Sequence, residues 1–257
     1  MSQMNEAPLE SLVDLCHKLG SPLWRLAILG EGNASTHLSE STFAVKGSGH
    51  SMGTLKLEGL AQCDFEPLLE AVEAKEVILD SDAVLLASRI DQKGIKPSVE
   101  ALFHAWLLTL PGVQFVAHTH PVAVNQILCS EHGEVFADRR IFPDQVVCCQ
   151  SRSLWVPYVD PGVALAREIA KRTRLFMDEH GFVPNAILCQ NHGLITLGPT
   201  AESAWGGTIM MEKAAQVFVG AVSISSTGMP VFMPSEEVDR IVGRPDEEYR
   251  RQILNFL

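Results

Sequence analysis

Two hydrophobic patterns alternate along the chain and predict a mixture of helices and strands. Apolar residues spaced three and four positions apart indicate amphipathic helices, whereas short uninterrupted apolar runs indicate buried strands. The helical pattern covers residues 6–20, 65–76, 98–110, 121–130, 161–181, 200–223, 235–242 and 247–257. The strand pattern covers 42–46, 113–120, 186–190 and 194–198, and two or three short strands are expected within 134–158. Residues 83–87 fit either a strand or the end of a helix.

Glycine and proline residues mark several of these boundaries. Gly20 follows the first helix, and Pro111-Gly112 ends the third. Ser98 can cap the start of that third helix, and Glu100 then falls in its first turn, where a negative charge suits the helix dipole.

The order of the elements favours a single α/β domain over residues 1–257, with a core at about 8–222 and a C-terminal helical tail at 235–257. The chain has no internal repeat, no low-complexity tract and no long linker. Strands and helices mix without strict β-α-β alternation. We therefore expect a central, largely antiparallel sheet covered by helices.

Composition narrows the classes of protein that fit. The 257 residues are 46% apolar and 20% charged, which suits a folded domain and excludes a disordered chain. The formal net charge of −11 argues against general binding to nucleic acid or to an anionic membrane. If the protein binds an anionic substrate, a local pocket must do so against this overall negative charge.

Targeting signals and cysteine spacing point to the cytoplasm. The first ten residues, MSQMNEAPLE, lack the basic start and the apolar stretch of a secretory signal. The uncharged stretches contain His, Pro and Gly and read as core rather than as membrane spans. The six cysteines form no CxxC pair, as expected for reduced thiols.

His118 and His120 are the sharpest chemical feature. Residues i and i+2 of a strand point to the same face, so both imidazoles project from the end of one apolar strand. Two such imidazoles supply two of the three protein ligands that an open zinc site usually has. The alternative is a plain strand end with two polar residues.

Two further residues can complete such a site. His192 lies in an Asn-His-Gly turn between two apolar segments, although a turn histidine can also simply face solvent. Glu100 lies at the start of the helix that leads into the His118 strand. A carboxylate beside a cation can be a ligand or a general base. His104 shares a helix face with Glu100 and is expected to orient it or a ligand rather than to bind the metal.

Glycine-rich loops at 30–35 and 46–49 offer backbone N–H groups, and Ser98 offers a hydroxyl at a helix start. Loops of this kind can hold a phosphate or another oxyanion, or can be ordinary turns. The sequence GEGNAS lacks the third glycine and the following helix of a dinucleotide-binding fingerprint. A GxSxG elbow, a Walker A loop and an HExxH motif are also missing.

Taken together, the ordered motifs closely resemble the class II aldolase/adducin family over about residues 8–222. This family includes fuculose- and rhamnulose-phosphate aldolases and ribulose-5-phosphate 4-epimerase. No single motif is decisive, whereas the ordered set is specific. The motifs are Gly32-Asn33-Ala34-Ser35, Lys46-Gly47-Ser48-Gly49, Lys96-Pro97-Ser98-Val99-Glu100, His118-Thr119-His120 and Asn191-His192-Gly193.

The resemblance implies one α/β/α domain, rings of four subunits and active sites at subunit interfaces. It implies that His118, His120 and His192 bind Zn²⁺ or another divalent metal, and that Glu100 is the catalytic base. The residues that match the substrate-phosphate pocket of the family are Gly32, Asn33, Ser48, Gly49 and Ser98.

Some positions depart from the fuculose-type pattern. Val99 stands where those aldolases have a second serine, and a position near Phe142 replaces a tyrosine that assists protonation. The Pro-Ser-Val-Glu and Glu-Gly-Asn forms are more similar to the aldolase domain of the bifunctional rhamnulose-phosphate aldolase/alcohol dehydrogenases.

The expected activity is zinc-dependent aldol cleavage or formation of a C–C bond in a sugar phosphate or a related hydroxy-carbonyl compound. The first alternative is a metal-dependent 4-epimerase of the same fold, against which Glu at position 100 argues because that branch typically carries Asp. The second alternative is a non-catalytic scaffold like the adducin head, which would be expected to have lost the histidines.

Overall fold

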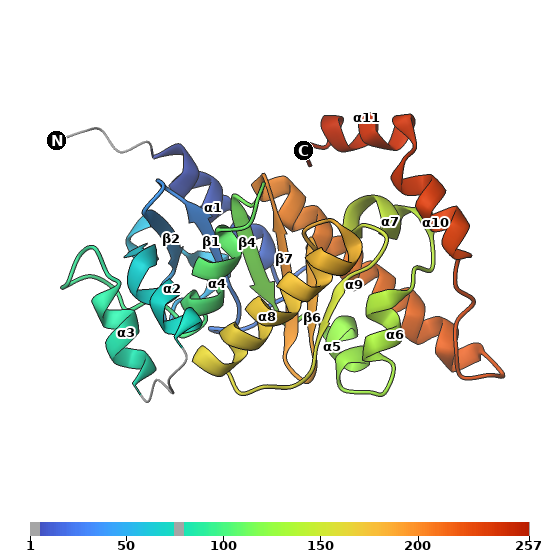
Figure 1. The fold of residues 1–257 in the computed structure, drawn as a ribbon, viewed down its shortest axis with the longest axis horizontal. Coiled ribbons are helices and arrows are strands. Elements are labelled where there is room, and N and C mark those ends of the chain that lie inside the picture. Colours follow the sequence, from blue (N-terminus) through green and yellow to red (C-terminus); the bar gives the residue numbers. More distant parts are fainter. Residues whose placement is uncertain (1–5, 75–79, 257) are drawn as a thin grey trace.

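A seven-stranded sheet runs through the centre of the computed structural model, which describes residues 6–74 and 80–256 (Figure 1). The strands span Asn33–His37 (β1), Thr42–Lys46 (β2), Leu60–Asp64 (β3), Phe115–Thr119 (β4), Leu154–Val156 (β5), Ala186–Cys189 (β6) and Gly193–Gly198 (β7). Their order is β3-β2-β1-β4-β7-β6-β5, and every neighbouring pair is antiparallel except β5 and β6. The largely antiparallel sheet expected from the sequence is confirmed.

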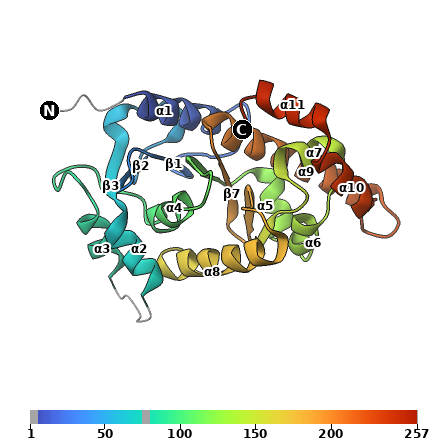
Figure 2. The same cartoon turned by 45° about the horizontal axis from the view of Figure 1, so that its top comes forward.

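Helices cover both faces of the sheet and give the molecule three layers (Figure 2). The helices span Ala7–Leu19 (α1), Phe65–Glu73 (α2), Ser81–Ala87 (α3), Ala101–Leu108 (α4), Val122–Leu128 (α5), Gly133–Asp138 (α6), Pro143–Cys149 (α7), Val163–His180 (α8), Ala201–Ile224 (α9), Ser235–Val242 (α10) and Pro245–Ile253 (α11). The helices α1 and α9 pack on one face, α4 and α8 pack on the other with α2 beside them, and α5 to α7 lie near the β5–β7 end. Two 3₁₀ turns follow β2, at Met52–Thr54 and Leu57–Gly59.

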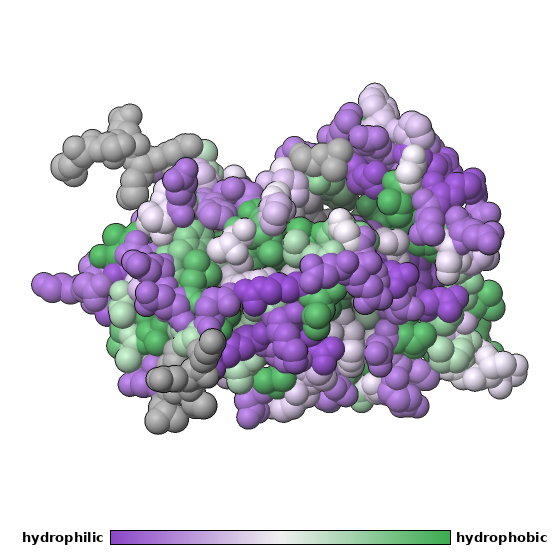
Figure 3. Space-filling model, in the orientation of Figure 1, coloured by the Kyte–Doolittle hydropathy of each residue, from purple (hydrophilic) through white to green (hydrophobic). Residues whose placement is uncertain are grey.

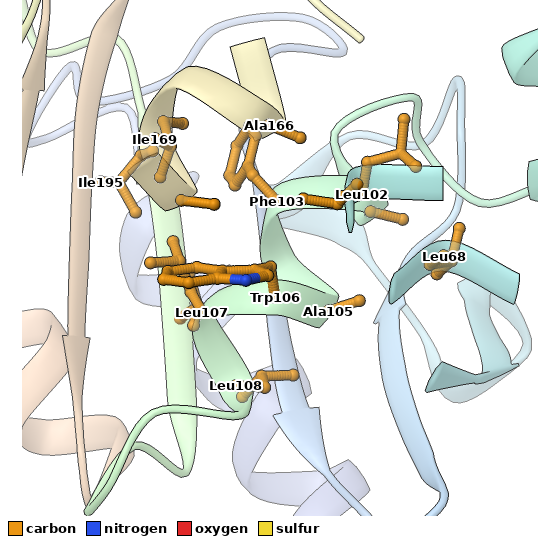
Figure 4. Close-up of a cluster of buried hydrophobic side chains, with 14 of the residues drawn as sticks. Leu68, Leu102, Phe103, Ala105, Trp106, Leu107, Leu108, Ala166, Ile169 and Ile195 are labelled. Atoms are coloured by element: carbon orange, nitrogen blue, oxygen red, sulfur yellow. The ribbon is translucent and has the colours of Figure 1, made fainter. Parts of the chain in front are cut away.

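Strand alternation divides the core between the two faces. Val116 of β4 and Ile195 of β7 belong to the cluster packed under α2, α4 and α8, whereas Phe115 and Ala117 belong to the cluster under α1. Figure 4 shows part of the first cluster, where the side chains of α4 meet those of α2 and α8. All eight residues of α4 are buried, so this helix is fixed on every side. The N-terminal end of α4, where Glu100 lies, is therefore held rigidly.

Several elements differ from the sequence expectation. Residues 134–158 form helices α6 and α7 and the single strand β5, so the expectation of two or three strands is wrong. Strands β1 and β3 were not expected at all, and residues 83–87 lie in helix α3. The helix expected from Ser98 begins at Ala101, which leaves Glu100 at the N-cap position instead of in the first turn. The end of the 65–76 helix partly lies outside the described residues.

On the face of the molecule shown in Figure 3, polar residues form a band where α8 lies, and hydrophobic residues are visible on either side of it. Among the described residues, none of the helices has both the length and the apolar character needed to cross a bilayer.

Candidate metal centre

Three imidazoles converge where the end of β4 meets the turn between β6 and β7. His118 is paired with Ile195 of β7 in the sheet, and His120 follows β4 by one residue. Asn191 adopts the left-handed conformation with φ of 52°, which asparagine tolerates, and turns the chain at His192. One ligand nitrogen of each histidine lies within 4.8 Å of the other two. The structure thus brings together the three histidines predicted from the sequence.

The outer nitrogen of His118 has a partner that orients its ring. Nδ1 of His118 lies 3.0 Å from the carbonyl oxygen of Leu194 and must donate to it. Nδ1 of His120 lies 3.9 Å from Oε1 of Glu31, which is too far for a hydrogen bond, and Nδ1 of His192 is buried without a hydrogen-bond partner among the described residues. A hydrogen bond such as that of His118 fixes the ring orientation of a histidine that binds a metal.

Glu100 places its carboxylate among the inward-facing nitrogens. Its Oε1 lies 3.3 Å from Nε2 of His118 and 3.1 Å from Nε2 of His192. Burial alone would raise the pKa of the Glu100 carboxyl, but attraction to His118 and hydrogen bonds from both imidazoles hold this pKa well below its usual range. The carboxylate is therefore ionised at neutral pH.

The donor set fits a divalent cation. Nε2 of His118 and Nε2 of His120 lie 3.0 Å apart. Because Nδ1 of His118 donates to the Leu194 carbonyl, Nε2 is the nitrogen of this ring that faces the centre and would bind a metal. Burial, followed by repulsion from His118 and His192, lowers the pKa of His120 to about 4, so this imidazole is neutral at neutral pH. Three imidazoles and a carboxylate are a ligand set that suits Zn²⁺.

The residues expected in the phosphate pocket come together only in part. Nδ2 of Asn33 lies 3.3 Å from Oγ of Ser98, and the same amide donates to the Glu100 carboxylate. The backbone N–H of Ser48 donates to the carbonyl of Lys96 at 2.9 Å, so the loop that contains Ser48 lies beside the segment that leads to Ser98.

The two glycines of the expected pocket have different surroundings. Gly32 has φ of 69°, and a Cβ there would lie 2.8 Å from the His118 carbonyl oxygen. Gly49 has φ of 78° with open space around it. The first glycine permits close packing on β4, and the second leaves a loop surface exposed to a ligand.

Sequence reasoning missed three residues near this centre. Lys46 is buried, and its ammonium donates to the carbonyl oxygens of Gly30 at 3.3 Å and His50 at 2.6 Å, which joins the two glycine-rich loops. Ser35 contacts His104, and Glu31 faces His120. Among these three residues, only Lys46 had a visible signal in the sequence, because a charged residue ends the apolar run TFAVK.

The family of the chain follows from its sequence. A profile of the family described as "Class II Aldolase and Adducin N-terminal domain" matches residues 10–219. This match covers most of the chain, and the protein therefore belongs to the class II aldolase and adducin family.

Proteins whose names carry different activities are similar to this chain. The chain is 32% identical over 203 residues to the uncharacterized oxidoreductase YuxG of Bacillus subtilis (strain 168), in a match that covers 74% of this chain and 26% of that protein. It is 26% identical over 191 residues to the 3-oxo-tetronate 4-phosphate decarboxylase of Haemophilus influenzae, covering 74% of this chain and 77% of that protein. The fold is similar to that of an L-fuculose 1-phosphate aldolase, with a TM-score of 0.70, 16% identity, and coverage of 97% of this chain and 100% of that one.

Proposed function

We propose that the protein is a divalent-metal-dependent lyase that cleaves or forms a C–C bond beside a carbonyl group, with aldol chemistry on a sugar phosphate or a related hydroxy-carbonyl compound as its reaction. The observation that carries this proposal is the convergence of three imidazoles and one ionised carboxylate at a single point. Membership of the class II aldolase and adducin family supports it.

His118, His120 and His192 would hold the metal, with Zn²⁺ as the proposed ion. When bound, a divalent cation supplies Lewis-acid polarisation of a substrate carbonyl and stabilises the enediolate charge. The hydrogen bond from His118 to the Leu194 carbonyl keeps that ring turned toward the centre.

Glu100 is the proposed base. In the condensation direction a base takes the C–H proton next to the carbonyl, and in the cleavage direction the same group returns it. The Glu100 carboxylate is ionised and partly enclosed, with its side chain 12% exposed, so it can accept a proton without competition from bulk water.

Ser48, Gly49 and Ser98 are the proposed contacts for an anionic group of the substrate, together with Gly32 and Asn33. The adjacent loops of Ser48 and Ser98 support this assignment. By resemblance to the family, we propose a homotetramer. The large exposed side chains of Leu23, Ile28 and Leu29, just before the Gly32 loop, suit coverage by a neighbouring subunit.

Decarboxylation is the second candidate, and the match to a 3-oxo-tetronate 4-phosphate decarboxylase favours it. Loss of CO₂ from a 3-oxo acid leaves the bonding electrons on the same kind of enediolate, which then takes a proton. The two reactions differ in the leaving group, an aldehyde in one and CO₂ in the other. A 4-epimerase outcome would regenerate the broken bond, and a metal-free scaffold would have no use for the converging imidazoles.

A screen with Zn²⁺-loaded protein tests this proposal. The substrates are ketose phosphates, aldonate and 3-oxo-aldonate phosphates and their unphosphorylated forms, with aldehyde and CO₂ measured separately. Glu100→Gln keeps the side-chain volume and should lower turnover by about 10²- to 10⁴-fold, the usual contribution of a positioned acid–base group.

Glu66→Gln is the matched control, because Glu66 is an exposed carboxylate in the first turn of α2, away from the centre. This variant should retain wild-type turnover. Near wild-type cleavage and solvent proton exchange by Glu100→Gln would remove Glu100 from the role of base. Absence of aldehyde and CO₂ from every substrate would contradict the proposed function.

A further inference from the structure

A hydrogen-bonded chain of buried side chains leads from strand β1 through helix α4 to the carboxylate of Glu100. Asn33 and Ser35 are two residues apart on β1, so both project to the face of the sheet that α4 covers. His104 lies four residues after Glu100, so both lie on the same side of the start of α4. The strand and the helix thus place these side chains in one row.

Each link of the chain is an observed contact. Oγ of Ser35 lies 2.7 Å from Nδ1 of His104. Nε2 of His104 contacts Oδ1 of Asn33, and Nδ2 of Asn33 contacts Oε2 of Glu100. Asn33 is 2% exposed, and Ser35 and His104 are both fully buried. Water therefore does not compete for these bonds.

The carboxylate at one end determines the direction of every bond in the chain. Nδ2 of Asn33 donates to Oε2 of Glu100, which leaves the amide oxygen of Asn33 to face His104 as an acceptor. Nε2 of His104 therefore donates, and its Nδ1 accepts from the hydroxyl of Ser35. Burial lowers the pKa of His104 to about 3, which agrees with a neutral ring.

We propose that His104, acting through Asn33, is a positioning residue that fixes the orientation of the Glu100 carboxylate. With Oε2 held by Asn33, Oε1 is left to face the imidazoles of His118 and His192. This inference rests on the proposed function, since it assigns the support of the proposed base.

The same chain gives Asn33 a second role. Its two amide hydrogens point to Glu100 and to Oγ of Ser98, and its oxygen accepts from His104. Asn33 therefore joins Glu100 to Ser98 of the proposed anion pocket.

The kinetic test compares His104→Phe with His104→Gln. Phenylalanine keeps a ring beside Phe103 but cannot donate to Asn33, so kcat should fall about 10- to 100-fold, the cost of a misplaced reactive group, while KM stays within about threefold. Glutamine offers an amide N–H at a similar reach and should restore most of the loss.

His37→Phe is the matched control. His37 also joins β1 to α4, through Nε2 and the carbonyl oxygen of Leu108, and its other ring nitrogen contacts the carbonyl oxygen of Ser39, so neither ring contact leads toward Glu100. Its kcat should remain near that of the wild type. Equal kcat losses in His37→Phe and His104→Phe, or no rescue by His104→Gln, would mean that His104 is merely part of the core and would overturn the proposal.

A spectroscopic readout separates this proposal from the proposed function. In protein labelled with ¹⁵N at histidine, the ring of His104 should show a protonated Nε2 and an unprotonated Nδ1 at neutral pH. Asn33→Ala should change the Nε2 signal of His104. The opposite tautomer would overturn the chain even in an active enzyme, whereas the expected tautomer in a protein without lyase activity would place the failure in the proposed function.

Discussion

Gly193 begins strand β7 directly after His192, and its missing side chain leaves room for the other two imidazoles. A Cβ at this position would lie 2.6 Å from Cδ2 of His120 and 3.1 Å from Cε1 of His118. It would also lie 2.6 Å from the carbonyl oxygen of Thr119, which cannot move without shifting β4. Because protein interiors are close-packed, the position tolerates no added methyl group.

We therefore expect Gly193→Ala to weaken Zn²⁺ binding by about 10-fold or more, comparable with the loss of an orienting contact to a metal-binding histidine. Competition with a chromophoric chelator measures the affinity, and circular dichroism checks that the fold is retained. Gly30→Ala serves as the control, because a Cβ at Gly30 meets nothing within 4 Å. Equal affinities for the two variants would show that the space at Gly193 does not shape the centre.

At the residue scale, the sequence predicted the convergence of the three histidines better than it predicted the residues that support them. Strand periodicity placed His118 and His120 on one face, and the spacing on a helix linked His104 to Glu100. The contact between His104 and Asn33 depends on the pairing of Asn33 with His118 across the sheet. That pairing could not be predicted, because residues 33–37 (NASTH) lack the apolar run that indicates a buried strand.

Helix α5 starts two residues after His120, and a buried carboxylate from α9 holds its first turn. Glu212 accepts hydrogen bonds from the backbone N–H groups of Ala123 at 3.1 Å and Val124 at 3.1 Å. A negative group at this end of a helix satisfies donors that have no partner within the helix. Glu212 therefore joins α9 to the segment that follows the β4 histidines.

Glu212→Ala should lower the free energy of unfolding by about 1–3 kcal/mol, because buried N–H groups lose their acceptor. Urea denaturation followed by fluorescence measures this change. Glu202→Ala, near the start of the same helix with its half-exposed carboxylate paired to Lys18, should change the stability by less than about 1 kcal/mol. A loss in Glu212→Ala no larger than in Glu202→Ala would contradict a capping role.

At the element scale, residues 134–158 show why local pattern was insufficient. Val146 and Val147 are β-branched neighbours, a composition that favours strands, yet both are buried in helix α7. Short helices covered on more than one side lose the clear spacing of an amphipathic helix. Pro143 in the first turn of α7 was the available helix signal.

Across the whole molecule, the candidate centre joins the end of β4 to the turn between β6 and β7. A ligand that binds the folded chain and not the unfolded chain stabilises the fold by about 2.7 kcal/mol at a concentration 100-fold above its Kd. We therefore expect Zn²⁺ to raise the melting temperature of metal-free protein by several degrees.

His120→Ala should abolish this increase, because it removes one of the three converging imidazoles. His180→Ala, on α8 and packed against Phe176, should retain the increase. Differential scanning calorimetry before and after addition of Zn²⁺ measures the difference. An undiminished shift in His120→Ala would place the metal elsewhere in the molecule.

Lys46 binds carbonyl oxygens from both glycine-rich loops with one buried ammonium group. The loops are therefore assembled when the chain folds, before any ligand arrives. Fixing the backbone of one residue costs about 1–2 kcal/mol of conformational entropy, and a flexible loop would meet that cost during binding. The proposed anionic substrate would meet a preorganised surface between these loops and would keep more of its contact energy as affinity.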